Sequence, residues 1–243
     1  MLDTNSFDLL ALDQVIDSYD YESDPVLRMH FRQIEEALWA MTEKYGEGVN
    51  DFGVQMAAHL RRTSLDGMKF MTEELGFSRR AGRNFHAANM FQDLGKIHPA
   101  YDPGIWALPD RPTEEQRAEK KKHPARGLEV LAVALKDAAP ELLNHPHISI
   151  VIPAIQLFHH ERVDGTGLFG KKGNEMGMVI KAVCIVDAKD GDMIQRAHQD
   201  FKRSEADALA RMQDPAGKYA GAFDHLLDRY VLYRQRHDEK VRA

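Results

Sequence analysis

The chain has 243 residues, of which 43% are hydrophobic and 29% are charged, and its net charge is −6. This composition is typical of a globular protein with one large domain, or one domain plus a helical appendage, and it excludes a general preference for nucleic acid or an anionic membrane. The single cysteine, Cys184, excludes an internal disulfide and favours a reducing cytoplasm. No stretch approaches the roughly 18 apolar residues of a membrane span, and we expect no secretion signal.

The first 50 residues are predicted to form an acidic arm and a short helical extension, and residues 51–243 to form the main domain. Residues 1–22 are acidic and weakly patterned, which indicates a short helix or a mobile arm. Asp24 and Pro25 predict a helix start, with Asp as the N-cap and Pro at the first helical position. Gly46 is expected to end this helix, whose apolar stripe would cover the main domain or mediate dimerisation.

From residue 51 the sequence predicts helices, because the alternation typical of β-strands is missing. One helix is expected over 51–75, ended by Gly76. Ser78 is expected to cap a second helix that carries Gln92 and Asp93 near its end.

The middle of the chain continues this pattern. A loop rich in Pro, Gly and Asp is expected over 99–112, and the run from Thr113 to Gln116 is a capping box that opens a further helix. Another helix should follow His123, and one more should span 148–160.

The last third of the chain starts with a glycine-rich loop over 162–174. Helices are then expected over 175–196, with Cys184 as a small buried hydrophobe, and over 204–212 and 216–236. The sequence therefore predicts an all-α helical bundle.

Candidate metal ligands are scattered over these helices. A single helical histidine is usually a surface group or a satisfied core group, but here a tandem histidine pair occurs with aspartates in apolar surroundings, where an unpaired carboxylate is costly. We therefore expect these side chains to share a cation. The candidates are His59, Asp93, His123, His159, His160 and Asp187.

Imidazole and carboxylate ligands without thiolate suit iron, manganese or zinc. A carboxylate between two metals can bridge them and activate water for in-line attack on a phosphodiester. Lys96, one turn beyond Asp93, would stabilise charge on the phosphoryl oxygens. The residues thus indicate a helical hydrolase with one or two divalent metal ions, without naming its substrate.

Two motifs resemble those of a known family. The run Gln92-Asp93-Leu94-Gly95-Lys96 resembles the HD-x-G-K motif of HD-domain phosphohydrolases. The run His159–Gly167 is similar to the HHExxDGxGYP signature of the HD-GYP subfamily up to its last two residues. Further segments, which begin at His123-Pro124, end at Asp187-Ala188 and span 217–230, resemble other parts of the same domain in the same order.

The resemblance implies an HD-domain helical bundle that hydrolyses cyclic di-GMP or a related nucleotide with two or three metal ions. It assigns His59, Asp93 and Asp187 to a first metal, with Asp93 as the bridge, and it adds Asp93, His123, His159 and His160 to a second. Lys96 matches the substrate-contacting lysine. Arg162 and Asp164 are expected to shape the glycine-rich loop, with Arg162 as a further candidate for substrate binding.

Three departures from the family pattern weaken this expectation. Gln92 replaces the first histidine of the HD pair, so the first site loses an imidazole ligand. Gln55 stands where three-metal members have a glutamate, and Leu168 replaces the tyrosine of GYP. We therefore predict one firmly bound ion beside a weaker or empty site.

The function hypotheses follow from these departures. The first is a phosphodiesterase with reduced activity in the cytoplasm. The second is an inactive module that senses a nucleotide or metal and acts through a signalling partner or as a homodimer. The third is a purely structural helical domain. No membrane and no nucleic-acid polymer is expected as a partner.

Other conspicuous residues are assigned structural roles. Trp39 and Trp106 are expected to be packing anchors. The lysines at 120–122 are expected to be a solvated helix face. The remaining histidines without ligand-like context are expected at the surface or at caps: His98, His145, His147, His198, His225 and His237.

Overall fold

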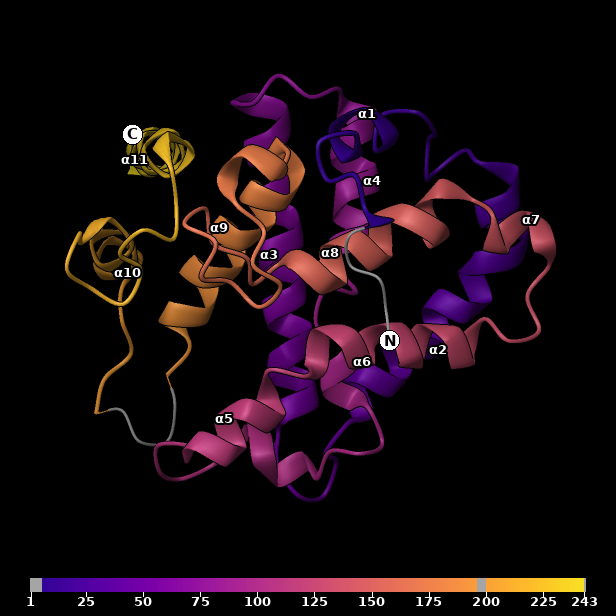
Figure 1. Ribbon diagram of the computed structural model, residues 1–243, viewed down its shortest axis with the longest axis horizontal. Helices are drawn as coiled ribbons and strands as arrows, with labels where there is room; N and C mark the ends of the chain where they lie inside the picture. The colour runs from indigo at the N-terminus through magenta and orange to yellow at the C-terminus, as the bar shows by residue number, and fades with distance from the viewer. Residues whose placement is uncertain (1–5, 196–199, 243) are drawn as a thin grey trace.

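A computed structural model describes residues 6–195 and 200–242, the last five of these by their backbone alone. Within these ranges the protein is built from helices and loops, and its only β-type pairing is an isolated antiparallel bridge between Asp164 and Lys172. The predicted all-α fold is confirmed (Figure 1). None of the helices in this part of the chain is both long and apolar enough to cross a membrane.

Helix α3 (Phe52–Glu73) runs through the middle of the molecule (Figure 1). It packs against α4 (Arg79–Asn89) on one side and α9 (Met178–Met193) on another. Gly76 ends α3 as predicted, since its φ of 80° is in the left-handed region that only glycine adopts readily.

Helix α4 begins as its sequence predicts, because the Ser78 side chain accepts a hydrogen bond from the backbone nitrogen of Ala81. Its end differs from the prediction. The Gln92-Asp93 pair lies beyond Asn89, in the turn before the 3-10 helix η3 (Leu94–Ile97). This turn points both side chains toward the centre of the molecule instead of along the surface of α4, and both are buried.

The N-terminal residues belong to the core. Helix α1 (Leu12–Val15) is short, as one alternative predicted, and Leu9, Leu12 and Ile16 are buried in the same hydrophobic cluster as α3 and α9. The Asp13 carboxylate accepts hydrogen bonds from the first backbone N–H groups of α9. The mobile-arm alternative is therefore wrong for the described residues 6–22.

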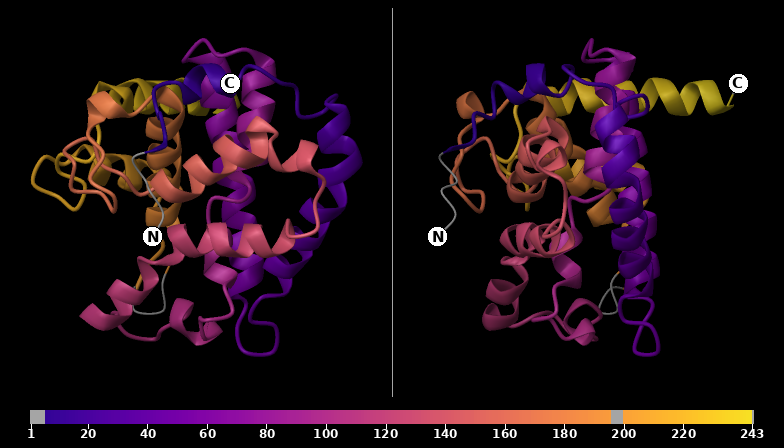
Figure 2. Two further views of the ribbon diagram at one scale, coloured as in Figure 1. Left: turned by 45° about the vertical axis from the view of Figure 1, so that its right-hand side comes forward. Right: turned by 90° about the vertical axis from the view of Figure 1, so that its right-hand side faces the viewer.

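The extension continues as a helix of mixed type, and its start confirms the prediction. The Asp24 carboxylate accepts from the backbone nitrogens of Val26 and Leu27. A π-helical segment η2 (Leu27–Phe31) then leads into α2 (Arg32–Lys44), which packs against α3. Figure 2 shows α2, coloured in indigo, beside the purple helix α3.

Helices α5 (Glu114–Lys120) and α6 (His123–Ala134) form the lower part of the molecule in Figure 1. The capping box of Thr113 and Gln116 opens α5 as predicted. The short η4 (Pro103–Trp106) lies in the preceding loop, and α7 (Pro140–Leu143) follows α6. Gly95 lets η3 lie directly on the start of α6, since a Cβ there would be 1.8 Å from the backbone oxygen of His123.

The remaining elements complete the bundle. The segment predicted over 148–160 starts as π-helix η5 (His147–Val151) and continues as α8 (Ile152–Phe158). The loop over 162–174 is present and ends in η6 (Gly173–Glu175). Ser204 caps α10 (Glu205–Gln213), whereas α11 (His225–Arg242) starts later than predicted because residues 216–224 form turns.

Two histidines expected at the surface are buried. His147 is fully enclosed, and its Nδ1 lies 2.7 Å from the Tyr19 hydroxyl, while His145 is in edge contact with the same tyrosine ring. Burial lowers the pKa of His147 to about 3, so it stays neutral. The prediction is wrong for His147, whereas Nδ1 of the buried His145 accepts from the backbone nitrogen of His147 at the start of η5, in agreement with the capping alternative. His198 lies outside the described residues.

Candidate metal centre

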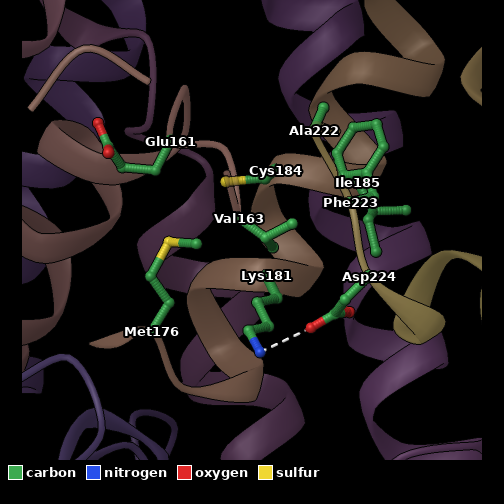
Figure 3. A pocket seen from close by; sticks show the side chains of 9 residues that line it. All are labelled: Glu161, Val163, Met176, Lys181, Cys184, Ile185, Ala222, Phe223 and Asp224. Atoms are coloured by element: carbon green, nitrogen blue, oxygen red, sulfur yellow. Dashed lines mark hydrogen bonds and ion pairs between the residues drawn. The ribbon is translucent and has the colours of Figure 1, made fainter. Parts of the chain in front are cut away.

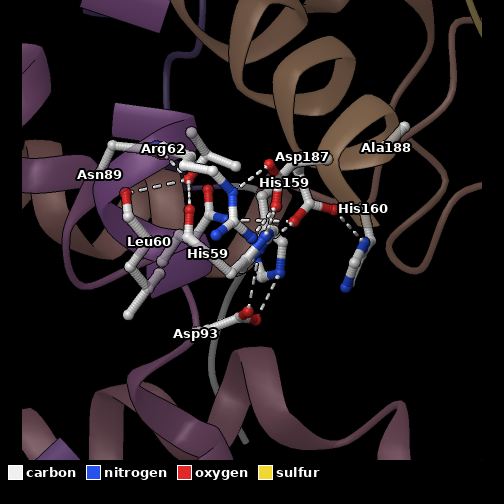
Figure 4. A network of polar contacts seen from close by, with 12 residues as sticks. His59, Leu60, Arg62, Asn89, Asp93, His159, His160, Asp187 and Ala188 are labelled. Carbon is white, nitrogen blue, oxygen red and sulfur yellow. Dashed lines mark hydrogen bonds and ion pairs between the residues drawn. The ribbon is translucent and has the colours of Figure 1, made fainter. Parts of the chain in front are cut away.

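The predicted ligand residues converge on one place (Figure 4). His59 comes from the middle of α3, and Asp187 faces it from α9. Asp93 lies in the turn after α4. The start of α6 contributes His123, and the end of α8 contributes His159 and His160. Their candidate ligand atoms form two groups that share Asp93, and within each group all atoms lie within 4.8 Å of one another.

Asp93 lies at the junction of the two groups and has no solvent exposure. Its Oδ1 is 3.2 Å from His123 Nε2 and 3.5 Å from His159 Nε2, and its Oδ2 is 2.6 Å from Lys96 Nζ. Burial alone would raise the pKa of this carboxyl, but the Lys96 ammonium and the imidazoles hold the pKa well below its usual range. Asp93 is therefore a buried carboxylate.

His123 and His159 are oriented by the backbone. Nδ1 of His123 lies 2.8 Å from the Lys120 carbonyl oxygen, and Nδ1 of His159 lies 2.8 Å from the Gln156 carbonyl oxygen. A carbonyl oxygen only accepts, so each Nδ1 carries a hydrogen, and a ring held in this way presents its Nε2 atom toward the centre. Burial lowers the pKa of His123, which favours this neutral form.

The two Nε2 atoms lie 3.1 Å apart and close to Asp93 Oδ1, which receives no aligned hydrogen bond. Where all three atoms carry lone pairs, they repel one another unless a cation lies among them. His160 completes this group, with its Nδ1 3.5 Å from Asp187 Oδ2. The donor set therefore fits a divalent metal ion held by imidazole and carboxylate.

The second group has a different hydrogen-bonding pattern. His59 Nδ1 lies 2.7 Å from Asp190 Oδ2, and its Nε2 lies 3.2 Å from Asp187 Oδ1. Burial alone would lower the pKa of His59, but the carboxylates of Asp187 and Asp190 raise it to about 9. In this half the imidazole is a proton donor to two carboxylates.

Asp190 was not among the predicted site residues. It accepts from His59 and also from Arg62 Nε at 2.7 Å, so it orients the ring in the way that carboxylates orient metal-binding histidines. The signal was present in the spacing, because Asp190 follows Asp187, and Arg62 follows His59, by about one helical turn.

Gln92 occupies the second group. Its side chain is buried, with Nε2 3.1 Å from Asp187 Oδ1 and 3.3 Å from His59 Nε2. The amide oxygen is buried without a partner. The substitution for histidine thus replaces a metal-binding nitrogen by a neutral amide group at the same depth.

A cavity of about 950 Å³ opens over both groups, and its wall has more basic than acidic side chains. Trp106, predicted as a packing anchor, stacks on Phe52, but it also lines this cavity and donates from Nε1 to the Lys96 carbonyl oxygen. Lys120 and Lys121 line it as well, so they are not simply a solvated face. The basic lining residues are Lys96, Arg111, Arg117, Lys120, Lys121, Arg162 and Lys218.

The glycine-rich loop is shaped by polar side chains at its start. The Glu161 carboxylate accepts from the backbone nitrogens of Phe169 and Lys171. Arg162 donates to the Ala220 carbonyl oxygen while also lining the large cavity, and the Asp164 carboxylate accepts from the backbone nitrogen of Thr166. These contacts agree with the predicted role of Arg162 and Asp164 in loop architecture.

A second cavity of about 10 Å³ lies beneath the loop (Figure 3). It is lined by Glu161 and Cys184 and by the ion pair of Lys181 and Asp224, whose charged atoms are 2.8 Å apart. Burial raises the pKa of the Cys184 thiol, which donates to the Phe158 carbonyl oxygen. Cys184 is therefore the unreactive buried group that the sequence predicted.

No family model matches this chain. Over 149 residues it is 28% identical to the cyclic di-GMP phosphodiesterase response regulator RpfG of Xanthomonas campestris, a match that covers 61% of this chain and 36% of RpfG. Over 133 residues it is 26% identical to the cyclic di-GMP phosphodiesterase PA4108 of Pseudomonas aeruginosa, covering 54% of this chain and 29% of that protein. The matched region thus spans about a third of each relative's length.

A similar fold occurs in Bd1817, an HDG"Y"P protein from Bdellovibrio bacteriovorus. The two structures superpose with a TM-score of 0.59 over 93% of this chain and 69% of the other, at 14% sequence identity. At that identity the superposition supports the fold alone, and the sequence matches carry the family resemblance. Together with the order of the motifs, the sequence matches support the resemblance of this chain to the HD-GYP subfamily of HD-domain proteins.

Proposed function

We propose that this protein is a metal-dependent phosphodiesterase that hydrolyses cyclic di-GMP or a related nucleotide. The observation that carries the proposal is the pair of imidazole Nε2 atoms of His123 and His159, which lie 3.1 Å apart against the buried Asp93 carboxylate. Two relatives in sequence carry the name cyclic di-GMP phosphodiesterase, which supports this substrate class.

The proposed ligands of the firmly bound ion are Asp93, His123, His159 and His160. Neutral imidazoles with one carboxylate suit iron or manganese, with zinc as an alternative. Such an ion, when bound, supplies Lewis-acid activation of water and of a phosphoryl oxygen. The chain's own contribution is to hold the ligands rigidly, since each orienting contact is to a helix backbone or a buried side chain.

Lys96 is proposed to stabilise negative charge on the substrate phosphate. Its ammonium lies 2.6 Å from Asp93 Oδ2, on the side of the centre that opens to the cavity. A preorganised cation beside the reacting phosphate contributes to phosphoryl transfer mainly through electrostatics. Arg162 adds a further positive charge to the same wall.

The cavity supports a nucleotide substrate with more than one phosphate. Its volume of about 950 Å³ is at the upper end of ligand sites, and basic residues from η3, α5 and the glycine-rich loop surround it. In a protein with a net charge of −6, this concentration of positive charge is local to the site. We propose that residues 51–243 carry the activity and that residues 1–50 buttress them.

Gln92 favours a second candidate function, a module that binds a nucleotide without hydrolysing it. The Gln92 amide donates to Asp187, so this carboxylate has a hydrogen-bond donor without a metal. Loss of one metal in a two-metal mechanism would leave binding intact while slowing the reaction.

Turnover and binding distinguish the two candidates. The protein, loaded with Fe(II) or Mn(II), is incubated with cyclic di-GMP and the products are separated by chromatography. We expect a linear dinucleotide or mononucleotide product that Asp93→Ala and His159→Ala abolish. Binding of cyclic di-GMP without any product would contradict the enzyme proposal and support the sensor. Neither binding nor turnover would contradict both.

A further inference from the structure

The two halves of the centre differ in the groups that face their ligand atoms. In the half made by Asp93 Oδ1, His123 and His159, backbone carbonyls fix both Nδ1 atoms, the two Nε2 atoms lie 3.1 Å apart, and Asp93 Oδ1 has no aligned hydrogen bond. In the other half, the amide nitrogen of Gln92 lies 3.1 Å from Asp187 Oδ1 and 3.3 Å from His59 Nε2. The Gln92 amide there already occupies a carboxylate lone pair that an ion would need.

We propose that this protein binds one divalent cation firmly and that the Gln92 amide keeps the His59–Asp187 half closed to a second. The inference deepens the proposed function by giving the metal count, and it rests on the same centre. Lys96 Nζ, 2.6 Å from Asp93 Oδ2, supplies positive charge on the side where the family resemblance implies another metal.

The closure follows from the chemistry of an amide. Nitrogen and oxygen of a glutamine are similar in size, and which one faces a neighbour depends on the hydrogen bonds available. A second ion would require the amide to turn and present its oxygen, which would break the bond to Asp187. The turned oxygen is a neutral ligand, weaker than the imidazole that the HD motif supplies.

Burial makes this arrangement persistent. Gln92 is 1% exposed and lies between α3 and α9, so water does not compete for its donor group. His59 is fixed from its other side by Asp190, which is itself held by Arg62. The second half is therefore a hydrogen-bonded cluster that does not depend on a metal for its shape.

Metal counting tests the inference without any activity measurement. Protein equilibrated with Mn(II) and freed of excess ion is analysed by elemental analysis. We expect one ion per chain in the wild type, two in Gln92→His, and one in Gln92→Met, which removes the amide without adding a ligand. Gln195→His is the matched control, because it adds an imidazole to an exposed part of the same cavity wall, and it should leave the count at one.

A titration of the wild type with Mn(II), followed by electron paramagnetic resonance, gives the count independently if Gln92→His does not fold. One tight ion, with any second ion bound at least about 10-fold more weakly, is the expected result. Two ions of equal affinity in the wild type, or a count of one in folded Gln92→His, would overturn the inference while leaving the proposed function intact. A wild type that binds no ion would overturn both.

Discussion

The two halves of the centre contain the same kinds of side chain but are prepared for different occupants. On the α6–α8 side, backbone carbonyls of Lys120 and Gln156 accept from the Nδ1 atoms, so the two Nε2 atoms face each other beside Asp93. On the α3–α9 side, carboxylates take both hydrogens of His59 and leave it a donor. Ligand identity alone therefore does not determine whether a site attracts an ion, because the partner on the far side of each ring sets its protonation.

The largest expected effect comes from removing one histidine from each half in turn. His159→Ala should eliminate the firmly bound ion and reduce hydrolysis to background, because it removes one of the two facing Nε2 atoms. His59→Ala should leave the ion count unchanged and lower the rate by less. Elemental analysis and product chromatography measure both. If His59→Ala lost the ion and His159→Ala kept it, the assignment of the two halves would be reversed.

A smaller effect is expected from Lys96→Met, which keeps the length of the side chain and removes its charge. We expect the rate to fall about 10²–10³-fold, as for other groups that stabilise transition-state charge. The ion should remain bound, since Lys96 neutralises Asp93 but is not a ligand. Lys122→Met is a control from the same basic region, because Lys122 pairs with Glu119 and does not line the cavity. A rate unchanged by Lys96→Met would remove Lys96 from the mechanism.

The smallest expected effect is on stability. It is a pH dependence of the free energy of unfolding that comes from His147, a buried histidine outside the metal centre. His147 has a pKa of about 3 in the folded chain and about 6.5 when unfolded. At this residue only the unfolded state takes up a proton in this window, so the contribution of His147 to the free energy of unfolding should fall by about 1.4 kcal/mol per pH unit as pH drops from 6.5 toward 3. This stability is fully present above pH 6.5.

Denaturant unfolding at a series of pH values measures the slope. His147→Gln should give a flatter dependence, with some loss of stability at neutral pH because Tyr19 loses its present partner. His225→Gln, at an exposed histidine, should keep the wild-type slope. An equally steep slope in His147→Gln would assign the acid sensitivity to other groups.

Local sequence signals predicted most helix boundaries. Ser78, Thr113 and Ser204 cap helices where their side chains can reach the backbone nitrogens of the first turn, and Gly76 ends α3. The start of α11 was predicted wrongly although local signals exist. Gly217 and Gly221 lie in the segment 216–224, Gly221 has a φ of 70°, and the Asp224 carboxylate accepts from the backbone nitrogen of Leu226 at the start of α11. Contacts of this segment with α9 and the glycine-rich loop also hold it in turns.

The N-terminal segment shows where local signals are missing. Its acidic composition gave no reason to choose a packed helix over a mobile arm. Leu9, Leu12 and Ile16 become buried only because α9 offers an apolar surface and uncapped N–H groups for Asp13. His147 is a comparable case, since its apolar surroundings come from Tyr19 and Phe31, distant along the chain.

The sequence by itself determined the all-α class, the order of the motifs and the residues that meet at the centre, because residue type and helical spacing encode them directly. The tertiary structure alone decided which imidazole nitrogens face backbone carbonyls and which face the centre. It also decided that Gln92 donates to Asp187, and that Asp190 and Trp106 join the site. Hydrogen positions depend on partners brought together from distant helices, and no local pattern specifies those partners.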